Sequence, residues 1–505
     1  MKGIKRFLCC LLAIATLGSV TAGLTACGGN SSDNHIVMTY IYGGTIPKDL
    51  KKVEKAVSDY AEEKVGVTVE FYPLSIFEQS KYTTIIGVDP IDLMYIGFAD
   101  PIEYYSMDMI QEITMDDLNE YAPKIMEIYK DYDLMIRDSK GDIIGISPVE
   151  DAVANGGSYV IRTSDLKAIG LDTKYPDQTK ITFDDLKEIF AKLKTQFPTN
   201  YPIGTTMDEA GYTFAFDSVG CDDMKSSGII ELNDINSTKV INYYESDGYK
   251  AYIELMRECY SKEWISRDAE TAVTSKNDDF KSGKARGVFV GCLPGLKDSF
   301  ATDVKEECTQ LQIVDPYYVP LRVNGSTWSI CGTSKKKEAT LKFMNLFWSD
   351  KKLMNMVQWG IEGDHFTVAD DVNNIIQYAN GYTNETTPYY NGAGIYGDKR
   401  YIYMYESTVM TREEQIASVQ NNRNMAAQAA LRPSKAGNFI YDSSKFTSVI
   451  ANIKSAINQY AKGLALGSGS QKDYEDMIKR MKSAGVDRVI ADKQAQLDAY
   501  LAAQN

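Results

Sequence analysis

The sequence contains few of the residue types on which most enzymes depend. It has two histidines among 505 residues, His35 and His365, and each stands alone. None of the patterns HExxH, GxSxG or GxxxxGK[ST] occurs in it. General acid–base catalysis and metal-assisted catalysis rely on such groups. Nothing in the sequence therefore demands catalysis, and we expect no catalytic residue.

Two pairs of neighbouring carboxylates and one glycine-rich segment are the remaining enzyme-like features. Asp116 with Asp117 and Asp184 with Asp185 could serve a glycosidase. Both pairs lie where helix N-termini are expected, and acids are favoured there. Residues 392–397 read GAGIYG but follow no clear buried strand and lead into no clear helix, so we interpret them as a loop.

The cysteines are too few and too unevenly spaced for a disulfide framework. Cys9 and Cys10 lie in an apolar N-terminal segment, and Cys27 follows it. The five that remain have no CxxC spacing: Cys221, Cys259, Cys292, Cys308 and Cys331. An odd number in this pattern favours buried free thiols, with at most one or two bridges, and argues against a zinc site. We expect no metal and no cofactor.

The chain also lacks an apolar run long enough for a stable membrane span, which needs about 20 residues. Lys2, Lys5 and Arg6 precede the apolar residues 7–20, and this layout is that of a signal peptide. The segment ends in Leu-Thr-Ala before Cys27, which resembles a bacterial lipobox, where the cysteine thiol is acylated. We therefore predict a lipoprotein signal over 1–26 and a lipidated tether over 27–34. The alternative is an ordinary secretory signal with a chance cysteine.

Positive charge is scarce as well. Removal of residues 1–26 takes away three positive charges and moves the net charge from −15 to about −18. Such a chain repels nucleic acid and anionic lipid, so both are poor partners. We expect the remaining chain to be soluble and held at the extracytoplasmic face of the cell membrane by its lipid.

What the chain has in abundance is length, tyrosine and alternating secondary structure. About 480 residues follow the signal, which is natural for two domains. The 34 tyrosines exceed the 17 phenylalanines, and tyrosine suits surfaces that bind polar ligands. Apolar spacing predicts strands over 36–41, 67–71 and 91–96, and helices over 50–65 and from 183. The C-terminal hundred residues read as mostly helical, with a break over 463–470. This order predicts α/β layers.

Several segments together resemble the extracellular solute-binding proteins of ABC importers, of the carbohydrate-type family one. The resemblance is carried by residues 92–95 and 109–113, by GDIIGISP over 141–148, by VIRTSDLKAIG over 160–170 and by FKSGKA over 280–285. WGIEGDHF over 359–366 and MKSAGVD over 481–487 are similar to the large LplA-like or aldouronate-type branch. Two departures are Phe183, where the family often has tryptophan, and Cys292-Leu293-Pro294, where many sugar binders have an aromatic residue.

The resemblance implies a two-lobed periplasmic-binding-protein-like (type II) clamp that closes over its ligand, with a helical C-terminal region. Lobe one would take residues 35–150 and 311–350, and lobe two 151–310 and 351–505. Aromatic rings would cover the apolar face of a sugar, and polar side chains would hold its hydroxyls. The ligand-binding candidates are Tyr42, Phe98, Asp100, Glu150, Asp151, Tyr212, Phe214, Trp328, Trp359 and Glu362. Each aromatic residue among them has a place in the core as its alternative.

The expected function is that of a surface-tethered binding protein. It would capture an oligosaccharide, an acidic sugar or another small solute between its lobes and deliver it to a membrane permease. We expect a monomer. Alternatives are capture of a peptide or another non-sugar solute, a surface glycan hydrolase, and a purely structural lipoprotein.

Overall fold

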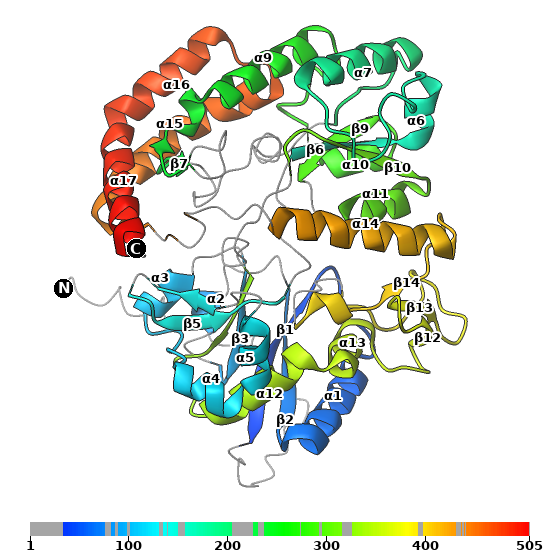
Figure 1. Cartoon of the computed structure of the whole chain (residues 1–505), viewed down its shortest axis with the longest axis vertical. Coiled ribbons are helices and arrows are strands. Elements are labelled where there is room, and N and C mark those ends of the chain that lie inside the picture. The colour runs from blue at the N-terminus through cyan, green and yellow to red at the C-terminus, as the bar shows by residue number, and fades with distance from the viewer. Residues whose placement is uncertain are drawn as a thin grey trace, which may run out of the picture.

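The computed structural model describes a chain of two lobes and a helical C-terminal region (Figure 1). The described residues are 34–75, 82–85, 89–97, 101–130, 135–138, 140–149, 157–204, 226–230, 237–272, 274–291, 295–315, 326–391, 397–430, 436, 439 and 441–503. The first lobe occupies the lower half of Figure 1 and the second lobe the upper half.

A six-stranded sheet forms the centre of the first lobe. Its strand order is β2-β1-β3-β11-β5-β4, with β1 parallel to β2 and β3, and β11 antiparallel to both β3 and β5. The strands are β1 (His35–Tyr42), β2 (Thr68–Ser75), β3 (Leu93–Gly97), β4 (Met135–Arg137), β5 (Ile143–Ile146) and β11 (Ser326–Ile330). Nearly every residue of β1 and β3 is buried, as expected for strands covered on both faces.

Helices on the sheet complete the core of this lobe. Helix α1 (Leu50–Val65) buries Leu50, Val53 and Val57, one turn apart, and ends at Gly66 with φ +70°. The other helices are α2 (Tyr82–Ile85), α3 (Pro101–Ser106), α4 (Met115–Tyr121), α5 (Pro123–Tyr129), α12 (Lys337–Ser349) and α13 (Lys351–Trp359). Buried side chains of α12 and α13 belong to the same hydrophobic core as those of α1.

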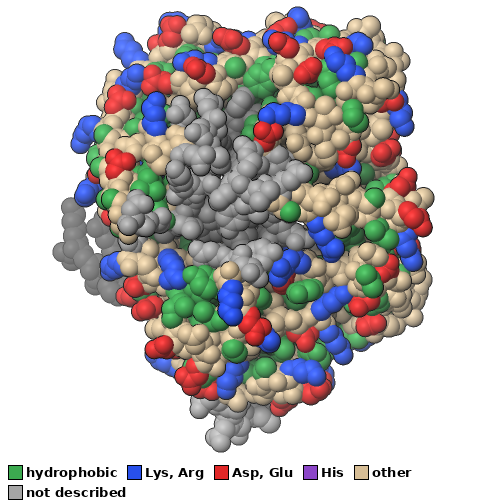
Figure 2. Space-filling model, in the orientation of Figure 1, with side chains coloured by type: hydrophobic (Ala, Val, Ile, Leu, Met, Phe, Trp, Pro, Cys, Tyr) green, Lys and Arg blue, Asp and Glu red, His purple; other side chains and the backbone are tan. Residues whose placement is uncertain are grey.

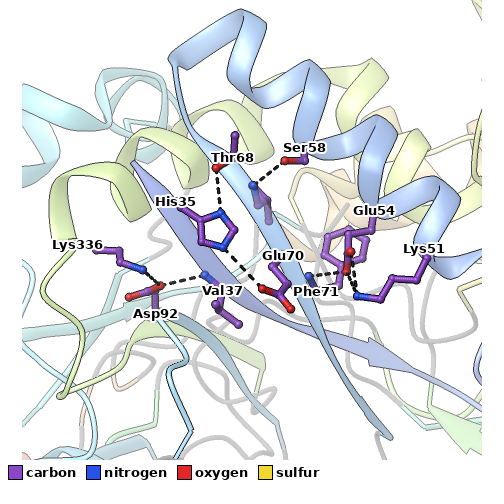
Figure 3. A network of polar contacts seen from close by, with 11 residues as sticks. His35, Val37, Lys51, Glu54, Ser58, Thr68, Glu70, Phe71, Asp92 and Lys336 are labelled. Atoms are coloured by element: carbon purple, nitrogen blue, oxygen red, sulfur yellow. Dashed lines mark hydrogen bonds and ion pairs between the residues drawn. The ribbon is translucent and has the colours of Figure 1, made fainter. Parts of the chain in front are cut away.

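A buried carboxylate joins three parts of this sheet near the start of β1 (Figure 3). Asp92 accepts hydrogen bonds from the Val37 amide at 2.9 Å and from the Ser334 hydroxyl at 2.6 Å, and it pairs with Lys336 at 3.2 Å. His35 contacts Thr68 and Glu70 of the neighbouring strand. These contacts fix the end of the sheet from which the N-terminal segment leaves, opposite to Tyr42.

The second lobe has a smaller, antiparallel sheet with the order β10-β6-β9. Its strands are β6 (Gly157–Arg162), β9 (Gly287–Gly291) and β10 (Cys308–Gln312), and β7 (Ile229–Ile230) pairs separately with β8 (Val240–Ile241). The helices around it are α6 (Thr163–Ala168), α7 (Phe183–Gln196), α9 (Asp247–Ser261), α10 (Lys276–Lys281) and α11 (Leu296–Val304).

The C-terminal helices pack on the second lobe. They are α14 (Arg412–Ala430), α15 (Thr447–Leu466), α16 (Gln471–Ala484) and α17 (Val486–Ala503). Ile453, Ile457 and Leu464 of α15 share a core with Tyr252 and Met256 of α9. The predicted helical region is therefore confirmed, but α15 continues through Gly463 and ends at Gly467, where φ is +82°.

A third sheet, β12-β13-β14, is attached to the first lobe through α13. It consists of β12 (Phe366–Asp370), β13 (Ile375–Tyr378) and β14 (Met404–Tyr405). The Asn355 side chain donates to the Tyr401 carbonyl at 2.9 Å and accepts from the Tyr403 amide at 2.7 Å. Leu353, Met354 and Val357 of α13 lie in the first core. The chain from α13 to β14 therefore belongs with the first lobe.

Within the described residues the chain passes from one lobe to the other at three places, which we call exchanges. The first exchange lies between β5 and β6, where the division at residue 150 was placed. Strand β10 pairs with β6, so the second lobe extends to residue 312. The third exchange lies at residues 406–411, because Val409 packs in the core of Val160 and Val288. Leu353, Met354 and Val357 of α13 lie in the core of the first lobe, whereas the predicted division is at residue 350.

Other sequence predictions can be compared directly with the structure. The helix N-termini expected at the two carboxylate pairs are confirmed: Thr114 with Asp117 and Thr182 with Asp185 form capping boxes. Cys259, Cys308 and Cys331 are buried free thiols, and burial raises the pKa of the last two to about 12. Cys221, Cys292 and residues 392–396 lie outside the described residues. No helix in the described ranges has the length and apolar character to cross a membrane.

Candidate functional site

Four aromatic side chains of the first lobe form one side of a cavity of about 460 Å³. We call Trp359, Tyr378, Tyr390 and Tyr405 the aromatic wall. Trp359 stacks on Tyr390 with ring centroids 5.5 Å apart, and Tyr378 stacks on Tyr405 at 3.7 Å. An edge-to-face contact of 5.0 Å between Trp359 and Tyr405 joins the two pairs. The wall is thus continuous. The volume of the cavity lies within the range typical of small-ligand sites.

Local structure holds each ring of the aromatic wall in place. Trp359 is the last residue of α13, and its indole N–H donates to the Tyr403 carbonyl at 2.9 Å. Tyr378 and Tyr405 end the neighbouring strands β13 and β14. Tyr390 precedes the buried Asn391, whose amide donates to the Ile41 carbonyl at the end of β1. The wall is therefore tied to the carboxyl end of the main sheet, where ligands of open α/β sheets bind.

Two helices of the second lobe face this wall across the cavity. Helix α11 contributes Asp298, Ser299 and Thr302, and Gly295 precedes it. Helix α14 contributes Gln415, Val419 and Asn422, and both sets recur at helical spacing. Figure 1 shows α14 between α11 and the third sheet. The exchange segment 406–411 contributes Glu406, Ser407, Thr408 and Met410. Side chains of both lobes therefore line one cavity, as a clamp requires.

Hydrogen bonds hold the exchange segment against α14. Glu406 accepts from Gln377 of β13 and from Arg412 of α14, and both bonds are 2.5 Å long. The Gln415 side chain accepts from the Ser407 amide at 2.9 Å and donates to the Tyr405 carbonyl at 2.9 Å. The bonds from Gln377 and Arg412 lower the pKa of Glu406. This segment couples the aromatic wall to the second lobe.

The polar groups of the cavity are acids, hydroxyls and amides. Asp298 and Glu406 are its charged side chains, and no lysine or arginine belongs to the described lining. Burial raises the pKa of Tyr378 to about 12 and that of Tyr405 higher still, so both remain neutral phenols at ordinary pH. Flat rings beside hydrogen-bonding groups suit a ligand with an apolar face and many hydroxyls.

The structure places one predicted ligand residue in this lining and three elsewhere. Trp359 belongs to the aromatic wall. Glu362 follows it by three residues but is exposed and is not part of the lining. Tyr42 is half-buried at the end of β1 and packs against the core of the first lobe. Trp328 is fully buried among Tyr95, Phe347 and Trp348, which is its core alternative.

The other predicted residues lie outside the described part of the chain. They are Cys27, Phe98, Asp100, Glu150, Asp151, Tyr212 and Phe214. Sequence reasoning missed Tyr378, Tyr390, Tyr405 and Asp298, all of which line the cavity. Alternating tyrosines at 401, 403 and 405 were a usable signal for a short strand with an aromatic face. Asp298 has no comparable signal, because it is one acid among many on a helix.

Among the described residues, one group has the composition of a metal site: Asp49, Asp364 and His365. The Ile361 amide donates to Nδ1 of His365 at 2.8 Å, so a neutral ring carries its proton on Nε2. That nitrogen lies 3.2 Å from Asp49, and Lys52 pairs with Asp364. The four side chains satisfy one another, and the buried His365 closes the turn that follows Trp359. The group thus fits a structural role better than a metal site.

Two of the sequence motifs meet in the second lobe and are structural there. Arg162 is buried, donates to the Ala285 carbonyl at 3.3 Å and pairs with Glu306 at 2.8 Å. Asp165, three residues later, pairs with Arg286. These contacts link the end of β6 to the start of β9. The residue types at 162 and 165 are therefore explained by the fold of the lobe rather than by a ligand.

Comparisons with known proteins relate this architecture to characterised structures. Residues 435–502, which include α15, α16 and α17, match a family described as a domain of unknown function, DUF3502. A carbohydrate ABC transporter substrate-binding protein of Streptococcus pneumoniae serotype 4 is 24% identical over 522 residues, covering 99% of each chain.

Solved structures share the fold over almost the whole chain. The N-glycan transport solute binding protein NgtS of Streptococcus pneumoniae superimposes with a TM-score of 0.76 at 18% identity, covering 93% of this chain and 100% of that one. An extracellular solute-binding protein of Bifidobacterium longum subsp. infantis gives 0.63 at 17% identity, covering 92% and 98%. The chain therefore has the two-lobed fold of extracellular solute-binding proteins.

Proposed function

We propose that this protein is the solute-binding component of an ABC importer and captures an oligosaccharide between its lobes. The observation that carries the proposal is the cavity itself. One lobe supplies the aromatic wall, the other supplies polar side chains of α11 and α14, and the exchange segment joins them. A ligand that contacts both sides stabilises the closed arrangement of the lobes. The permease would then recognise the closed form.

The relatives support a saccharide as the ligand class. NgtS has been crystallised in complex with Man1GlcNAc and with Man5GlcNAc. The relative with 24% identity carries the name of a carbohydrate transport protein. We propose by analogy that an oligosaccharide is the solute of this chain. Membership in the LplA-like or aldouronate-type branch is the finer form of this proposal.

The place of the protein at the cell surface is part of the same proposal. Acylation of Cys27 would anchor the chain at the extracytoplasmic face of the membrane, with residues 28–34 as the tether. His35 lies about 23 Å from Tyr42, because each of the seven steps along β1 spans about 3.3 Å. The tether thus joins the lobe at the end of the sheet away from the cavity. A monomer suffices, since one chain supplies both walls of the cavity.

The surface around the lobes fits a role without nucleic acid. Figure 2 shows basic, acidic and hydrophobic side chains interspersed over the described part of this face, with no broad basic patch. The net charge of −15 adds a repulsion against polyanions. A small uncharged solute is not affected by this repulsion.

A thermal-shift screen of the chain from residue 31 onward tests the proposal. The panel holds manno-, gluco-, xylo- and N-acetylglucosamine oligosaccharides, uronate oligosaccharides and peptides. A ligand at a hundred times its Kd adds about 2.7 kcal/mol to the free energy of unfolding. We expect a glycan to raise Tm and to be recovered intact by mass spectrometry. Cleavage of the glycan would indicate a hydrolase, and stabilisation by peptides alone would reject the carbohydrate ligand.

A further inference from the structure

One carboxylate of the cavity has an oxygen that no neighbour satisfies. Oδ2 of Asp298 accepts from the Ser418 hydroxyl at 2.6 Å and from the Asn422 amide at 3.2 Å. Oδ1 is buried and has no hydrogen-bond partner among the described residues. Buried polar atoms in native proteins are nearly always paired. Asp298 is thus held in a fixed orientation by one oxygen, while the other is buried and unpaired among the described residues.

On the opposite side of the cavity, the phenol oxygen of Tyr405 is also unsatisfied among the described residues. Its hydroxyl is buried and makes no hydrogen bond to any described residue. Its raised pKa keeps it protonated at ordinary pH. A phenol both donates and accepts, whereas a carboxylate only accepts. A sugar hydroxyl can satisfy either group, because it also donates and accepts.

Two cations close to the lining in sequence, Arg412 and Lys297, are paired with acids. Arg412 donates to Glu406 through Nε at 2.9 Å and through Nη2 at 2.5 Å. Lys297, next to Asp298 in sequence, pairs with Asp177 at 2.8 Å. The charged groups that line the cavity are Asp298 and Glu406, both acidic. No lysine or arginine belongs to the described lining, so this lining supplies no counter-ion to an anionic ligand.

We infer that the cavity selects uncharged saccharides and rejects sugars that carry a carboxylate. The inference rests on the proposed function, since it assigns a ligand class to the same site. An uncharged sugar gives hydroxyl donors to Asp298 and places its apolar face on the aromatic wall. A uronate in that position brings a further negative charge close to Asp298, which has no ion-pair partner among the described residues, whereas Glu406 is already paired with Arg412. Like charges within one small cavity repel each other, and a cavity that excludes water screens this repulsion weakly.

Matched pairs of glycans test this inference directly. The probes are mannotetraose, cellotetraose and N-acetylglucosamine tetramer, each with a derivative in which one C6 hydroxymethyl group is oxidised to a carboxylate. Calorimetric titration of the mature chain measures Kd for both members of a pair. We expect the oxidised member to bind at least about tenfold more weakly, which corresponds to about 1.4 kcal/mol. Because screening weakens repulsion, the ratio should shrink between 20 mM and 500 mM NaCl.

A conservative variant assigns the discrimination to one residue. Asp298→Asn removes the charge but keeps an oxygen that accepts from Ser418, and it should reduce the preference for the neutral member at least about threefold. Asp303→Asn is the matched control, because Asp303 lies on the same helix, is exposed and pairs with Lys281 outside the cavity. The control should leave the preference unchanged.

The outcomes separate the inference from the proposed function. Tighter or equal binding of an oxidised member overturns the inference while the protein remains a glycan-binding protein. An unchanged preference in Asp298→Asn also overturns the assignment to this cavity. Binding of no member of any pair contradicts the proposed function itself, and the inference falls with it.

Discussion

Two clusters of aromatic side chains in the first lobe look alike in sequence but differ in their surroundings. The core cluster comprises Tyr95, Trp328, Phe347 and Trp348, and its rings meet at angles between 53° and 88°. Trp328 and Trp348 have no exposed surface. In the aromatic wall, Tyr390 is 50% exposed and the two stacked pairs lie within 16° of parallel.

The two clusters also differ in whether their polar groups have hydrogen-bond partners. In the core cluster, the Trp348 indole donates to the Ser147 carbonyl at 2.8 Å, and the Tyr95 hydroxyl lies 3.2 Å from that of Ser326. In the wall, the buried Tyr405 hydroxyl has no hydrogen-bond partner among the described residues. Across the cavity, Oδ1 of Asp298 also has none. Aromatic content alone does not distinguish the two clusters. An open ring face beside an unsatisfied polar group does.

The largest expected effect is on stability, in the core cluster. Trp328→Ala removes a fully buried ring and leaves a cavity, so it should lower the free energy of unfolding by about 3–5 kcal/mol. Urea titration followed by circular dichroism measures the change. Trp328→Phe, which keeps an aromatic ring, should lose clearly less. Near-native stability of the alanine variant would show that the ring is not part of a packed core.

The second effect is on binding, in the aromatic wall. Take a glycan that raises the Tm of the wild type. Trp359→Ala should weaken its binding by about 2 kcal/mol, close to a thirtyfold rise in Kd, because a central aromatic contact is lost. Its free energy of unfolding should fall by less than that of Trp328→Ala, since Trp359 is only half-buried. Calorimetric titration and urea titration together separate these effects. A thermally weakened protein with unchanged Kd would place the ligand elsewhere.

A smaller effect is expected where a single atom is removed. Tyr405→Phe keeps the stacked ring but deletes the buried hydroxyl, and it should cost about 1 kcal/mol of binding if a ligand hydroxyl pairs with that group. The same deletion should not lower stability in the absence of ligand, because the hydroxyl has no partner among the described residues. Titration of both proteins with one glycan measures the difference. Equal affinities would exclude a contact to this hydroxyl.

The smallest effect concerns pH and the exchange segment. Hydrogen bonds from Gln377 and Arg412 lower the folded-state pKa of Glu406. A lowered carboxyl pKa contributes stability above the unfolded-state value of about 4.3, and this contribution is lost as pH falls through the folded value. Glu406→Gln should therefore destabilise by about 0.5–1 kcal/mol at pH 7, and its effect should vanish near pH 3. Equal effects at both pH values would contradict an ionic role.

Local patterns were enough to predict many elements of the fold. The spacing of Leu50, Val53 and Val57 predicts α1, and Gly66 ends it as expected. Thr182 with Asp185 and Ser470 with Asp473 form capping boxes, which their spacing of three residues indicates. These features depend on residues three or four positions apart, which a sequence shows directly.

The site could be predicted only in part because it depends on contacts between distant segments. A motif predicted Trp359. Its neighbour Tyr405 is positioned by the antiparallel pairing of β12 with β13 and the parallel pairing of β13 with β14. Its neighbour Tyr390 is positioned by Asn391, which bonds to Ile41. The predicted boundary at residue 350 rests on the family resemblance, whereas side chains of α13 lie in the core of the first lobe. No local signal says that a helix continues to pack on the preceding lobe.

Intrinsic fluorescence tests whether a glycan binds at the aromatic wall. The chain has four tryptophans, and Trp264, Trp328 and Trp348 are at most 3% exposed, whereas Trp359 is half-buried in the cavity lining. Addition of a glycan that raises Tm should change the emission of the wild type and of Trp328→Phe, and the change should be lost in Trp359→Phe. A full change that persists in Trp359→Phe would contradict this account and place the ligand away from the wall.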